Sequence, residues 1–359
     1  MKKTEIAVVG GGPAGMSAAL AAAAQGAKVS LFDSAREHLG GQLIKQTHRF
    51  FGSEKENAGT RGIEIRAMLE KEILENENID VHMDSTVLSI YYGNEIGVEE
   101  KNTYDIWKYD KLVVATGASE KMLPFTNNDM PGVYGAGAVQ TLMNVYGVTP
   151  GKRVLMIGSG NIGLIVSYQL MQAGVKVAAI VEALPNIGGY RVHASKVRRM
   201  QVPILTSHTV LKAYGDETVE GAVICEIDDK FQPVPGTEQN IECDIICLSV
   251  GLSPLTELMW PVGCKMKYVP ALGGNVPLRD EKMETTTEGI YVAGDASGVE
   301  EATAAMIEGK IAGLSAAAAL GYDTNYEARS NEYVNDIRIL RSGPTGAQIR
   351  QGLAQLREV

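Results

Sequence analysis

Two copies of one glycine signature hold the residues whose types and spacing are best suited to chemistry. Each copy reads G-x-G-x-x-G, and the six glycines are Gly10, Gly12, Gly15, Gly158, Gly160 and Gly163. In such a turn the first glycine allows a tight bend, the second lets the backbone approach a pyrophosphate, and the third lets helix and strand pack closely. The N-terminus of the following helix then offers unpaired N–H groups and a partial positive charge to the phosphates.

Strands and helices in a fixed order must position these glycines. An apolar strand precedes each signature (residues 6–9 and 154–157), and a helical stretch follows it. A second strand then ends on an acid, Asp33 or Glu182, which follows the first glycine by 33 − 10 = 23 and 182 − 158 = 24 residues. An acid at about this spacing accepts hydrogen bonds from ribose hydroxyls. The pattern therefore predicts two bound dinucleotides, with electron transfer between them.

The composition excludes several classes of protein. With 359 residues the chain is long enough for two domains, and its net charge of −10 argues against a nucleic-acid partner. We expect no membrane span, because no run approaches the ~20 apolar residues that a membrane helix needs. The four cysteines include no C-x-x-C pair and are too scattered for a secreted disulfide framework. The five histidines show no metal-ligand spacing. We therefore expect a cytoplasmic protein without a metal site.

The order of the motifs predicts an α/β fold of two Rossmann-like domains, the second inserted in the first. A helix is expected near residues 60–76, and three prolines between residues 124 and 150 mark the approach to the second signature. The segment SVGLSP after residue 248 resembles the earlier ATGASE, which indicates a return to the first domain. The expected limits are 1–118 plus 248–325 for the first domain, 119–247 for the second, and 326–359 for a polar C-terminal tail.

Together these motifs resemble the two-dinucleotide-domain flavoproteins, the superfamily of thioredoxin reductase and glutathione reductase, over roughly residues 4–320. The resemblance implies that FAD binds the first domain and a nicotinamide dinucleotide the second. The FAD-binding residues that it implies are Gly10, Gly12, Pro13, Ala14, Gly15, Asp33, Gly41, Gln42, Val87, Ala115, Thr116, Gly117, Gly294, Asp295, Ala302 and Thr303. The corresponding NAD-binding residues are Gly158, Gly160, Asn161, Ile162, Gly163, Glu182 and Gly251.

Three of these assignments follow from smaller motifs of the family. The aspartate of Gly294-Asp295 resembles the one that binds the ribityl and pyrophosphate region of FAD. The loop that contains Gly41 and Gln42 resembles the loop that lies along the flavin. Thr303 stands where the family places a helix N-terminus against the flavin N1 and C2 carbonyl, and such a helix end favours the anionic reduced flavin. Asp33 replaces the family's glutamate at the ribose.

The chain also departs from these families. Without C-x-x-C, thioredoxin reduction is excluded, and 359 residues leave no room for the dimerisation domain of glutathione reductase. Residues 124–160 resemble the flavoprotein subunits of opine oxidase, hydrogen cyanide synthase and proline dehydrogenase complexes. The loop 40–53 resembles the small flavoprotein that accompanies anaerobic glycerol-3-phosphate dehydrogenases. NAD is favoured over NADP, because Glu182 would repel a 2′-phosphate and Arg191 is nine positions further along the chain.

The leading hypothesis is an enzyme that moves hydride between NAD(H) and FAD and exchanges electrons with a partner dehydrogenase subunit, in an oligomeric complex. That partner would oxidise an amino or imino acid or glycerol-3-phosphate. Lys45 and His48 are the only candidate proton donors beside the flavin. A self-contained reductase or oxidase using ferredoxin, quinone or oxygen is an alternative, and it would need Tyr326 or Tyr333 to shield the flavin. A non-catalytic scaffold subunit that holds nucleotides is a second alternative.

Overall fold

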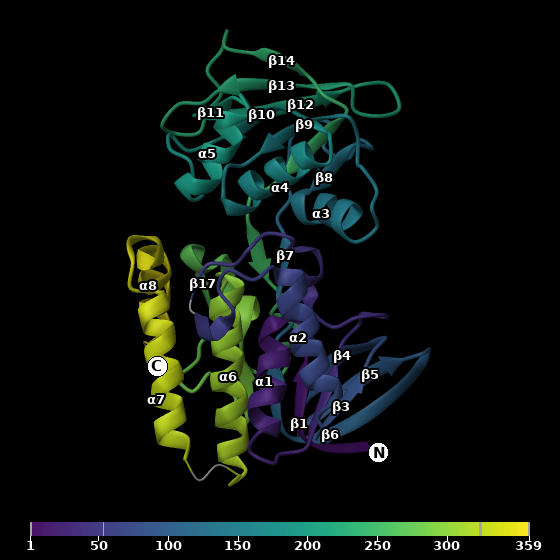
Figure 1. Cartoon of the computed structure of the whole chain (residues 1–359), viewed down its shortest axis with the longest axis vertical. Coiled ribbons are helices and arrows are strands. Elements are labelled where there is room, and N and C mark those ends of the chain that lie inside the picture. The colour runs from purple at the N-terminus through teal and green to yellow at the C-terminus, as the bar shows by residue number, and fades with distance from the viewer. Residues whose placement is uncertain (1, 53, 323–324, 358–359) are drawn as a thin grey trace. The chain divides into compact units, whose positions relative to one another are not determined.

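The computed structural model describes residues 2–52, 54–322 and 325–357 (Figure 1). Contacts divide the chain into two compact units, of which unit 1 comprises Met1–Ser119 and Ser253–Val359 and unit 2 comprises Glu120–Leu252. Unit 2 is inserted in unit 1, and the chain crosses between them after residues 119 and 252, against expected boundaries after 118 and 247. Two short strands mark the crossings, β7 (Ala118–Glu120) and β16 (Leu252–Pro254), and they pair with each other.

Unit 1 is built on a parallel sheet with the strand order β3-β2-β1-β6, and β19 pairs with the other side of β6. An antiparallel extension, β4-β5-β6, continues this sheet. The strands are β1 (Lys2–Val9), β2 (Val29–Phe32), β3 (Ile79–His82), β4 (Ser85–Tyr91), β5 (Glu95–Glu100), β6 (Thr103–Val114) and β19 (Ile290–Val292). Side chains of β1 alternate between two cores: Ile6 and Val8 pack with the helices, and Ala7 and Val9 pack with β4 and β5.

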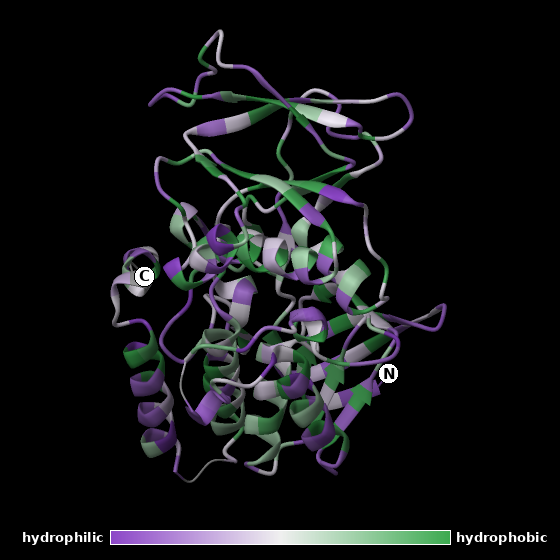
Figure 2. Ribbon diagram, turned by 45° about the horizontal axis from the view of Figure 1, so that its top comes forward, coloured by the Kyte–Doolittle hydropathy of each residue, from purple (hydrophilic) through white to green (hydrophobic). Residues whose placement is uncertain are grey.

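Helices cover one face of this sheet (Figure 1). They are α1 (Pro13–Ala23), α2 (Gly62–Leu74) and α6 (Ala302–Ala319), so the helix expected near 60–76 is present. The segment expected as a polar tail forms two further helices, α7 (Tyr326–Leu340) and α8 (Ala347–Ala354), which belong to unit 1. Polar and apolar residues alternate along α7, the helix at the left edge of Figure 2. Its apolar residues include Ile337, which is buried in the same core as α6.

Unit 2 repeats this arrangement of layers. Its parallel sheet has the order β11-β10-β9-β15-β8, helices cover one face, and an antiparallel sheet β12-β13-β14 packs on the other. The strands are β8 (Val133–Gly135), β9 (Arg153–Ile157), β10 (Lys176–Glu182), β11 (Ile204–Thr206), β12 (His208–Tyr214), β13 (Gly221–Glu226), β14 (Gln239–Glu242) and β15 (Ile245–Leu248). The helices are α3 (Ala136–Asn144), α4 (Asn161–Gln172) and α5 (Arg191–Arg199). Two Rossmann-like α/β units are thus present, as predicted.

Within the described residues, no helix is both long and apolar enough to cross a membrane.

Candidate functional site

The first glycine signature forms the turn between β1 and α1. Gly10 has φ 104°, and a Cβ on it would overlap the carbonyl oxygen of Ala115. A Cβ on Gly15 would overlap the carbonyl oxygen of Gly10, so α1 packs directly on the end of β1. Gly12 differs, because a Cβ there would meet only the Cα of Gly41, at 4.0 Å. Gly10 and Gly15 are thus required by the fold, whereas the space at Gly12 suits an approaching phosphate.

Asp33 is tied to this turn by its carboxylate. The Gly11 N–H donates to Oδ2 of Asp33, and the Ala35 N–H donates to Oδ1 at 2.7 Å. The chain then returns to the turn, since the Gly40 N–H donates to the carbonyl of Gly11 at 2.8 Å. Gly41, at φ 50°, follows directly. The acid at the end of β2 and the loop expected along the flavin therefore both lie beside the glycine turn.

Packing between α6 and α1 brings the second half of unit 1 to the same place. A Cβ on Gly309 would overlap the carbonyl oxygen of Ala14, and one on Gly313 would overlap that of Ala18. The two helices are therefore in backbone contact and run in the same direction. Since α6 begins seven residues before Gly309, its N-terminus extends about 10 Å beyond Ala14. The two helix ends point toward the same side of the unit.

The Gly294-Asp295 motif lies between these two helix ends. Gly294 has φ 70°, and a Cβ on it would lie 2.8 Å from the Cβ of Ala14. The pKa of Asp295 is raised to about 6, chiefly by burial and also by the carboxylates of Glu308 and Glu300, against a lowering hydrogen bond from the Glu300 N–H. That N–H lies 3.3 Å from Oδ1 of Asp295. A partly buried carboxylate with so few donors is suited to accept hydrogen bonds from ligand hydroxyls.

The loop expected along the flavin contacts the first turn of α6. Thr303 is buried, its hydroxyl donates to the carbonyl of Phe51 at 3.1 Å, and a Cβ on Gly52 would lie 2.9 Å from Thr303 Cγ2. Ala302 is the first residue of α6 and is partly exposed. The side chain of Thr303 thus anchors the loop, and only its backbone is left to face a ligand.

Four other residues expected at the first site have different surroundings. Thr116 donates its hydroxyl to the carbonyl of Leu255 at 2.7 Å, and the carbonyl of Gly117 accepts the Leu255 N–H at 3.0 Å, so both fix the crossing strands. Val87 is buried in the core that contains Phe32, just before Asp33. Gln42 is exposed in the loop.

Lys45 and His48, the two candidate proton donors, lie in the same loop and are partly exposed. The His48 ring stacks on Phe50, with centroids 5.5 Å apart. The loop is fixed on both sides of His48, by Gln46 to α2 and by Phe51 to Thr303. A role for either side chain as a proton donor stays a prediction.

The second glycine signature repeats the geometry of the first between β9 and α4. Gly158 has φ 102°, and a Cβ on it would overlap the carbonyl oxygen of Ser249. A Cβ on Gly163 would overlap the carbonyl of Gly158, and one on Gly160 would meet nothing within 4 Å. The described atoms thus leave the space at the second glycine open, and the turn retains the features that a phosphate needs.

The carboxylate of Glu182 accepts two backbone hydrogen bonds, as that of Asp33 does, and also one from a side chain. The Ser159 N–H donates to Oε2 at 2.9 Å and the Leu184 N–H donates to Oε1 at 2.9 Å. The Ser159 hydroxyl also donates to Oε2, at 2.6 Å. Glu182 is 9% exposed, so its carboxylate is presented in a fixed orientation at the mouth of the turn.

The loop after Glu182 also returns to its glycine turn. The Gly189 N–H donates to the carbonyl of Ser159 at 2.9 Å, and the Tyr190 N–H donates to Oδ1 of Asn161 at 2.8 Å. Helix α5 therefore starts beside the N-terminus of α4, and Arg191 is its first residue. The distance along the chain had suggested that Arg191 is remote from the turn. Of the other expected residues, Ile162 packs against the core of unit 2, and Gly251, at φ 109°, lies between β15 and β16.

Comparison with known proteins identifies the family. A family model described as pyridine nucleotide-disulphide oxidoreductase matches residues 4–309. The chain belongs to this family. It is accordingly a flavoprotein oxidoreductase, and the family implies FAD and a pyridine nucleotide as cofactors.

The curated relatives of this flavoprotein are subunits of larger enzymes. An opine oxidase subunit of Agrobacterium tumefaciens (strain Ach5) is 29% identical over 338 residues, which cover 88% of this chain and 66% of that protein. The HcnB subunit of hydrogen cyanide synthase from Pseudomonas protegens is 26% identical over 328 residues, which cover 86% of this chain and 69% of that protein. The flavoprotein spans 66% and 63% of the first two opine oxidase subunits that it matches.

Solved structures show the same fold. Thioredoxin reductase from T. acidophilum has a TM-score of 0.74 at 22% identity, over 89% of this chain and 99% of that chain. L-proline dehydrogenase from P. horikoshii has a TM-score of 0.66 at 25% identity, over 92% of this chain and 59% of that chain. The predicted two-domain α/β flavoprotein fold is therefore confirmed.

The cysteines of the flavoprotein are unlike those of a disulfide reductase. Cys225, Cys243, Cys247 and Cys264 are all free and buried. Burial raises the pKa of Cys243 to about 12, and it raises the pKa values of Cys225 and Cys247 as well. Since the thiolate is the reactive form of cysteine, these three thiols are unsuited to redox exchange. Among the described residues, no cluster of His, Cys, Asp or Glu could hold a metal ion.

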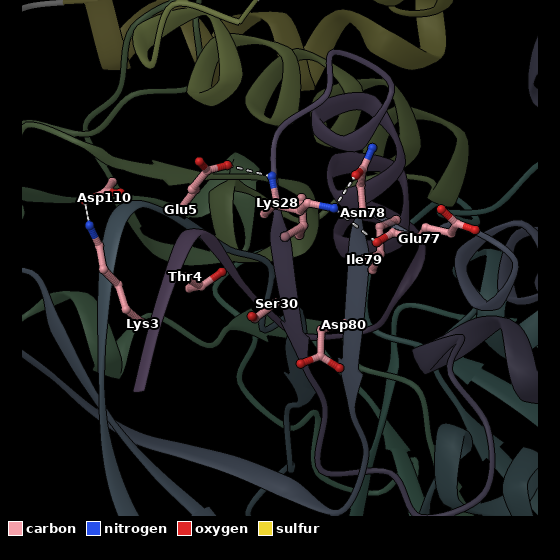
Figure 3. Close-up of a pocket in the computed structure, with 11 residues that line it drawn as sticks. Lys3, Thr4, Glu5, Lys28, Ser30, Glu77, Asn78, Ile79, Asp80 and Asp110 are labelled. Carbon is pink, nitrogen blue, oxygen red and sulfur yellow. Dashed lines mark hydrogen bonds and ion pairs between the residues drawn. The ribbon is translucent and has the colours of Figure 1, made fainter. Parts of the chain in front are cut away.

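A groove of about 660 Å³ lies at the other end of the unit 1 sheet, where β1, β2 and β3 begin (Figure 3). Several of its charged groups are already bonded to other groups of the protein. Lys3 Nζ is 3.4 Å from Asp110, Lys28 Nζ donates to Asn78 at 2.7 Å, and the Lys28 N–H donates to Glu5 at 2.7 Å. Ligands of such sheets bind at the carboxyl ends of the strands, so this groove is not a dinucleotide site.

Sequence reasoning missed several contacts that shape the two sites. The hydrogen bond from the Ser159 hydroxyl to Glu182 could have been predicted, because Ser159 stands where the first signature has Gly11. The Phe51–Thr303 bond joins residues 252 positions apart and has no local signal. The same holds for Glu308, which accepts from the Gly294 N–H at 3.1 Å and from the Ser297 hydroxyl at 3.0 Å.

Proposed function

We propose that this chain is the electron-transfer flavoprotein of a multi-subunit dehydrogenase or oxidase, moving hydride between NAD(H) and FAD and exchanging electrons with a partner subunit. One observation carries the proposal: two glycine turns of the same geometry stand in a chain whose cysteines form no redox pair. Both Gly12 and Gly160 leave open the space that a pyrophosphate needs. With no dithiol to receive the electrons, the electrons must enter or leave through another molecule.

The first turn fits FAD. Asp33 at the end of β2 would hold the adenosine ribose, the N-terminus of α1 would bind the pyrophosphate, and Asp295 would accept from the ribityl chain. The N-terminus of α6 lies about 10 Å further on, where the flavin ring would lie. When bound, FAD supplies the exchange of hydride for single electrons or electron pairs. The residues of this chain orient it and place a positive helix end near it.

The second turn fits NAD better than NADP. The carboxylate of Glu182 is fixed by Ser159 and Leu184, so it cannot swing away from a 2′-phosphate without breaking those hydrogen bonds. A carboxylate in that position would repel the phosphate and accept from a free 2′-hydroxyl. Arg191 is the one nearby cation of α5 that could offset this charge, because α5 starts beside the turn.

The relatives support a partner subunit. The opine oxidase, hydrogen cyanide synthase and sarcosine oxidase relatives are each named as one subunit of an enzyme. By analogy, the partner of this chain would oxidise an amino or imino acid, or glycerol-3-phosphate, and the substrate pocket would lie on that partner. We expect the chain to work within such an oligomer.

The structure offers less support to a self-contained reductase. That alternative needs Tyr326 or Tyr333 over the flavin. The hydroxyl of Tyr326 lies 3.3 Å from Oγ of Ser315, which is about 20 Å along α6 from its first residue. The Tyr333 ring lies against Lys310, about 12 Å along the same helix. Neither tyrosine is at the end of α6 where the flavin is expected.

Anaerobic titration tests the proposal. The purified chain, loaded with FAD, should lose its flavin absorbance on addition of NADH and recover it on addition of an artificial acceptor. Turnover with oxygen alone should be slow. A protein that binds FAD but is not bleached by NADH would favour the scaffold alternative. Rapid steady turnover with oxygen, ferredoxin or quinone and no partner would favour the self-contained reductase.

A further inference from the structure

A cluster of four charged side chains lies behind the Gly294-Asp295 motif. We call it the Glu308 cluster, and its members are Arg279, Glu300, Glu308 and Arg341. All four are largely buried, with side-chain exposures of 9% for Arg279, 4% for Glu308, 11% for Arg341 and 15% for Glu300. Charges so far from water are tolerated only when they are paired and hydrogen-bonded.

Glu308 joins this cluster to the turn. Its Oε2 accepts the Gly294 N–H at 3.1 Å and the Ser297 hydroxyl at 3.0 Å, so it holds both ends of the short helical turn that contains Asp295. Its Oε1 faces the two arginines, at 2.8 Å from Arg279 and 2.7 Å from Arg341. A change in the charge balance at Glu308 is therefore transmitted directly to the backbone of the turn.

Arg341 connects the cluster to the end of the chain. It follows α7 and donates to Glu300 from Nε, at 2.9 Å to Oε2 and 3.2 Å to Oε1, and from Nη2, at 2.6 Å to Oε2. Nη2 also donates to Glu308. The Glu300 N–H in turn donates to Asp295. Arg341 thus contacts Glu308, whose carboxylate binds the turn, and Glu300, whose backbone N–H binds it. It also lies beyond residues 4–309, the part of the chain that the family model matches.

Charge counting shows why Arg341 matters. Asp295, Glu300 and Glu308 provide three carboxylates within one buried region, and Arg279 and Arg341 provide two cations. Without Arg341 the three carboxylates would face Arg279 alone. The electrostatic cost of a second uncompensated buried charge would then be relieved by protonation of a carboxylate or by movement of the turn.

We propose that Arg341 is a positioning residue for the flavin dinucleotide: it neutralises Glu300 and Glu308 and thereby holds the Gly294-Asp295 turn in the conformation that binds FAD. This inference rests on the proposed assignment of FAD to the first glycine turn. Helix α7 then has a function in cofactor binding, although it supplies no atom to the cofactor. Ion pairs from Lys55 to Glu332 at 2.7 Å and to Asp336 at 3.1 Å place the helix against the loop that precedes α2.

The test compares variants of the full chain prepared without FAD. Arg341→Met keeps much of the apolar stem but removes the charge, and the dissociation constant for FAD should rise by about 10- to 100-fold. The reduction potential of the bound flavin should become more negative, because an added net negative charge disfavours the anionic reduced flavin. Hydrogen exchange of residues 293–301 in the FAD-free protein should become faster.

Three further variants separate the effect of charge from the effect on folding. Ile337→Ala removes a buried side chain from α7 without changing any charge, so it should lower stability but leave FAD affinity and flavin potential near the wild-type values. The double variant Arg341→Met, Glu300→Gln restores the net charge of the region and should recover most of the lost affinity. Arg341→Lys, which keeps the charge but not the planar fork, should have an intermediate affinity.

These outcomes distinguish the inference from the proposed function. A wild-type chain that does not bind FAD would overturn both. If the wild type binds FAD and Arg341→Met binds it with unchanged affinity, the inference alone fails. It also fails if Ile337→Ala weakens FAD binding as much as Arg341→Met does at an equal loss of stability, or if the double variant recovers nothing.

Discussion

Substitution of Gly12 by alanine separates cofactor binding from folding. Gly12 has φ −73° and ψ −175°, which is extended backbone that any residue adopts. The added Cβ would meet only the Cα of Gly41, at 4.0 Å, so nothing in the protein opposes it. Ala is a slightly poorer N-cap than Gly, but it also lowers the entropy of the unfolded chain. We expect the stability of the FAD-free protein to change by less than about 1 kcal/mol.

FAD binding should suffer instead. The methyl group would occupy the space through which the pyrophosphate approaches the N–H groups at the start of α1. A hydrogen bond to a charged acceptor is worth roughly 1.5–3 kcal/mol, so lengthening one or two of them should cost roughly 2–4 kcal/mol. Since each 1.4 kcal/mol is tenfold, the dissociation constant should rise about 30- to 1,000-fold.

The assay is a titration of FAD-free protein with FAD, followed by flavin fluorescence, beside thermal unfolding of the same samples. Gly160→Ala is the matched control. It should fold and bind FAD normally, because nothing in the described structure lies within 4 Å of a Cβ added there. It should lose reduction by NADH, because the methyl group would fill the space for the pyrophosphate at the second turn. Gly15→Ala should instead reduce stability, since its Cβ overlaps the Gly10 carbonyl. If Gly12→Ala bound FAD within threefold of the wild type, the first turn would not be the FAD site.

Three further predictions test packing, ionisation and specificity. Gly309→Ala would force α6 away from the carbonyl of Ala14 and should cost about 1–3 kcal/mol of stability; an unchanged melting temperature would contradict that contact. Because the pKa of Asp295 is raised from 3.8 to about 6, the folded state binds its proton more tightly, and FAD-free stability should fall as the pH rises from about 4 to above 6. Asp295→Asn should remove that loss of stability, so in denaturant titrations the free energy of unfolding should increase by roughly 1–3 kcal/mol at pH 7 and little at pH 4. Equal increases at both pH values would refute the raised pKa of Asp295. Glu182→Arg should raise the ratio of kcat/KM for NADPH to that for NADH about tenfold or more, and an unchanged ratio would place the ribose elsewhere.

The parts of the structure that the sequence predicted are those with local causes. A glycine turn is specified by a strand, three glycines and a helix that are adjacent in the chain, and its acid lies only 23 or 24 residues on. Gly10, Asp33, Gly158 and Glu182 accordingly occupy related positions in their two units. Family resemblance supplied the more distant residues, among them Asp295, whose position depends on the packing of α6 on α1.

The C-terminal helices show what a compositional reading misses. Residues 326–359 contain many polar residues, and the sequence suggested a tail. Yet Tyr333, Val334, Ile337 and Leu340 recur at helical spacing, and all four pack against the unit 1 core. That stripe was readable from the sequence. The contacts of Arg341 with Glu300 and Glu308, 41 and 33 residues away, were not, since ion pairs carry no periodic signal.

The internal repeat extends further than its glycines. Seven residues after Asp33, the Gly40 N–H donates to the carbonyl of Gly11, and seven residues after Glu182 the Gly189 N–H donates to that of Ser159. The connecting sequences, SAREHLG and ALPNIGG, share almost nothing except that length and the final glycine. What is repeated is therefore a requirement of the backbone: each loop must return to its phosphate turn, and it needs a glycine where it does so. The two loops then diverge, since the first continues toward Thr303 and the second starts α5 at Arg191. This divergence is consistent with the different roles that we propose: the first loop would lie along the flavin, and the second would lie beside the phosphates of NAD(H).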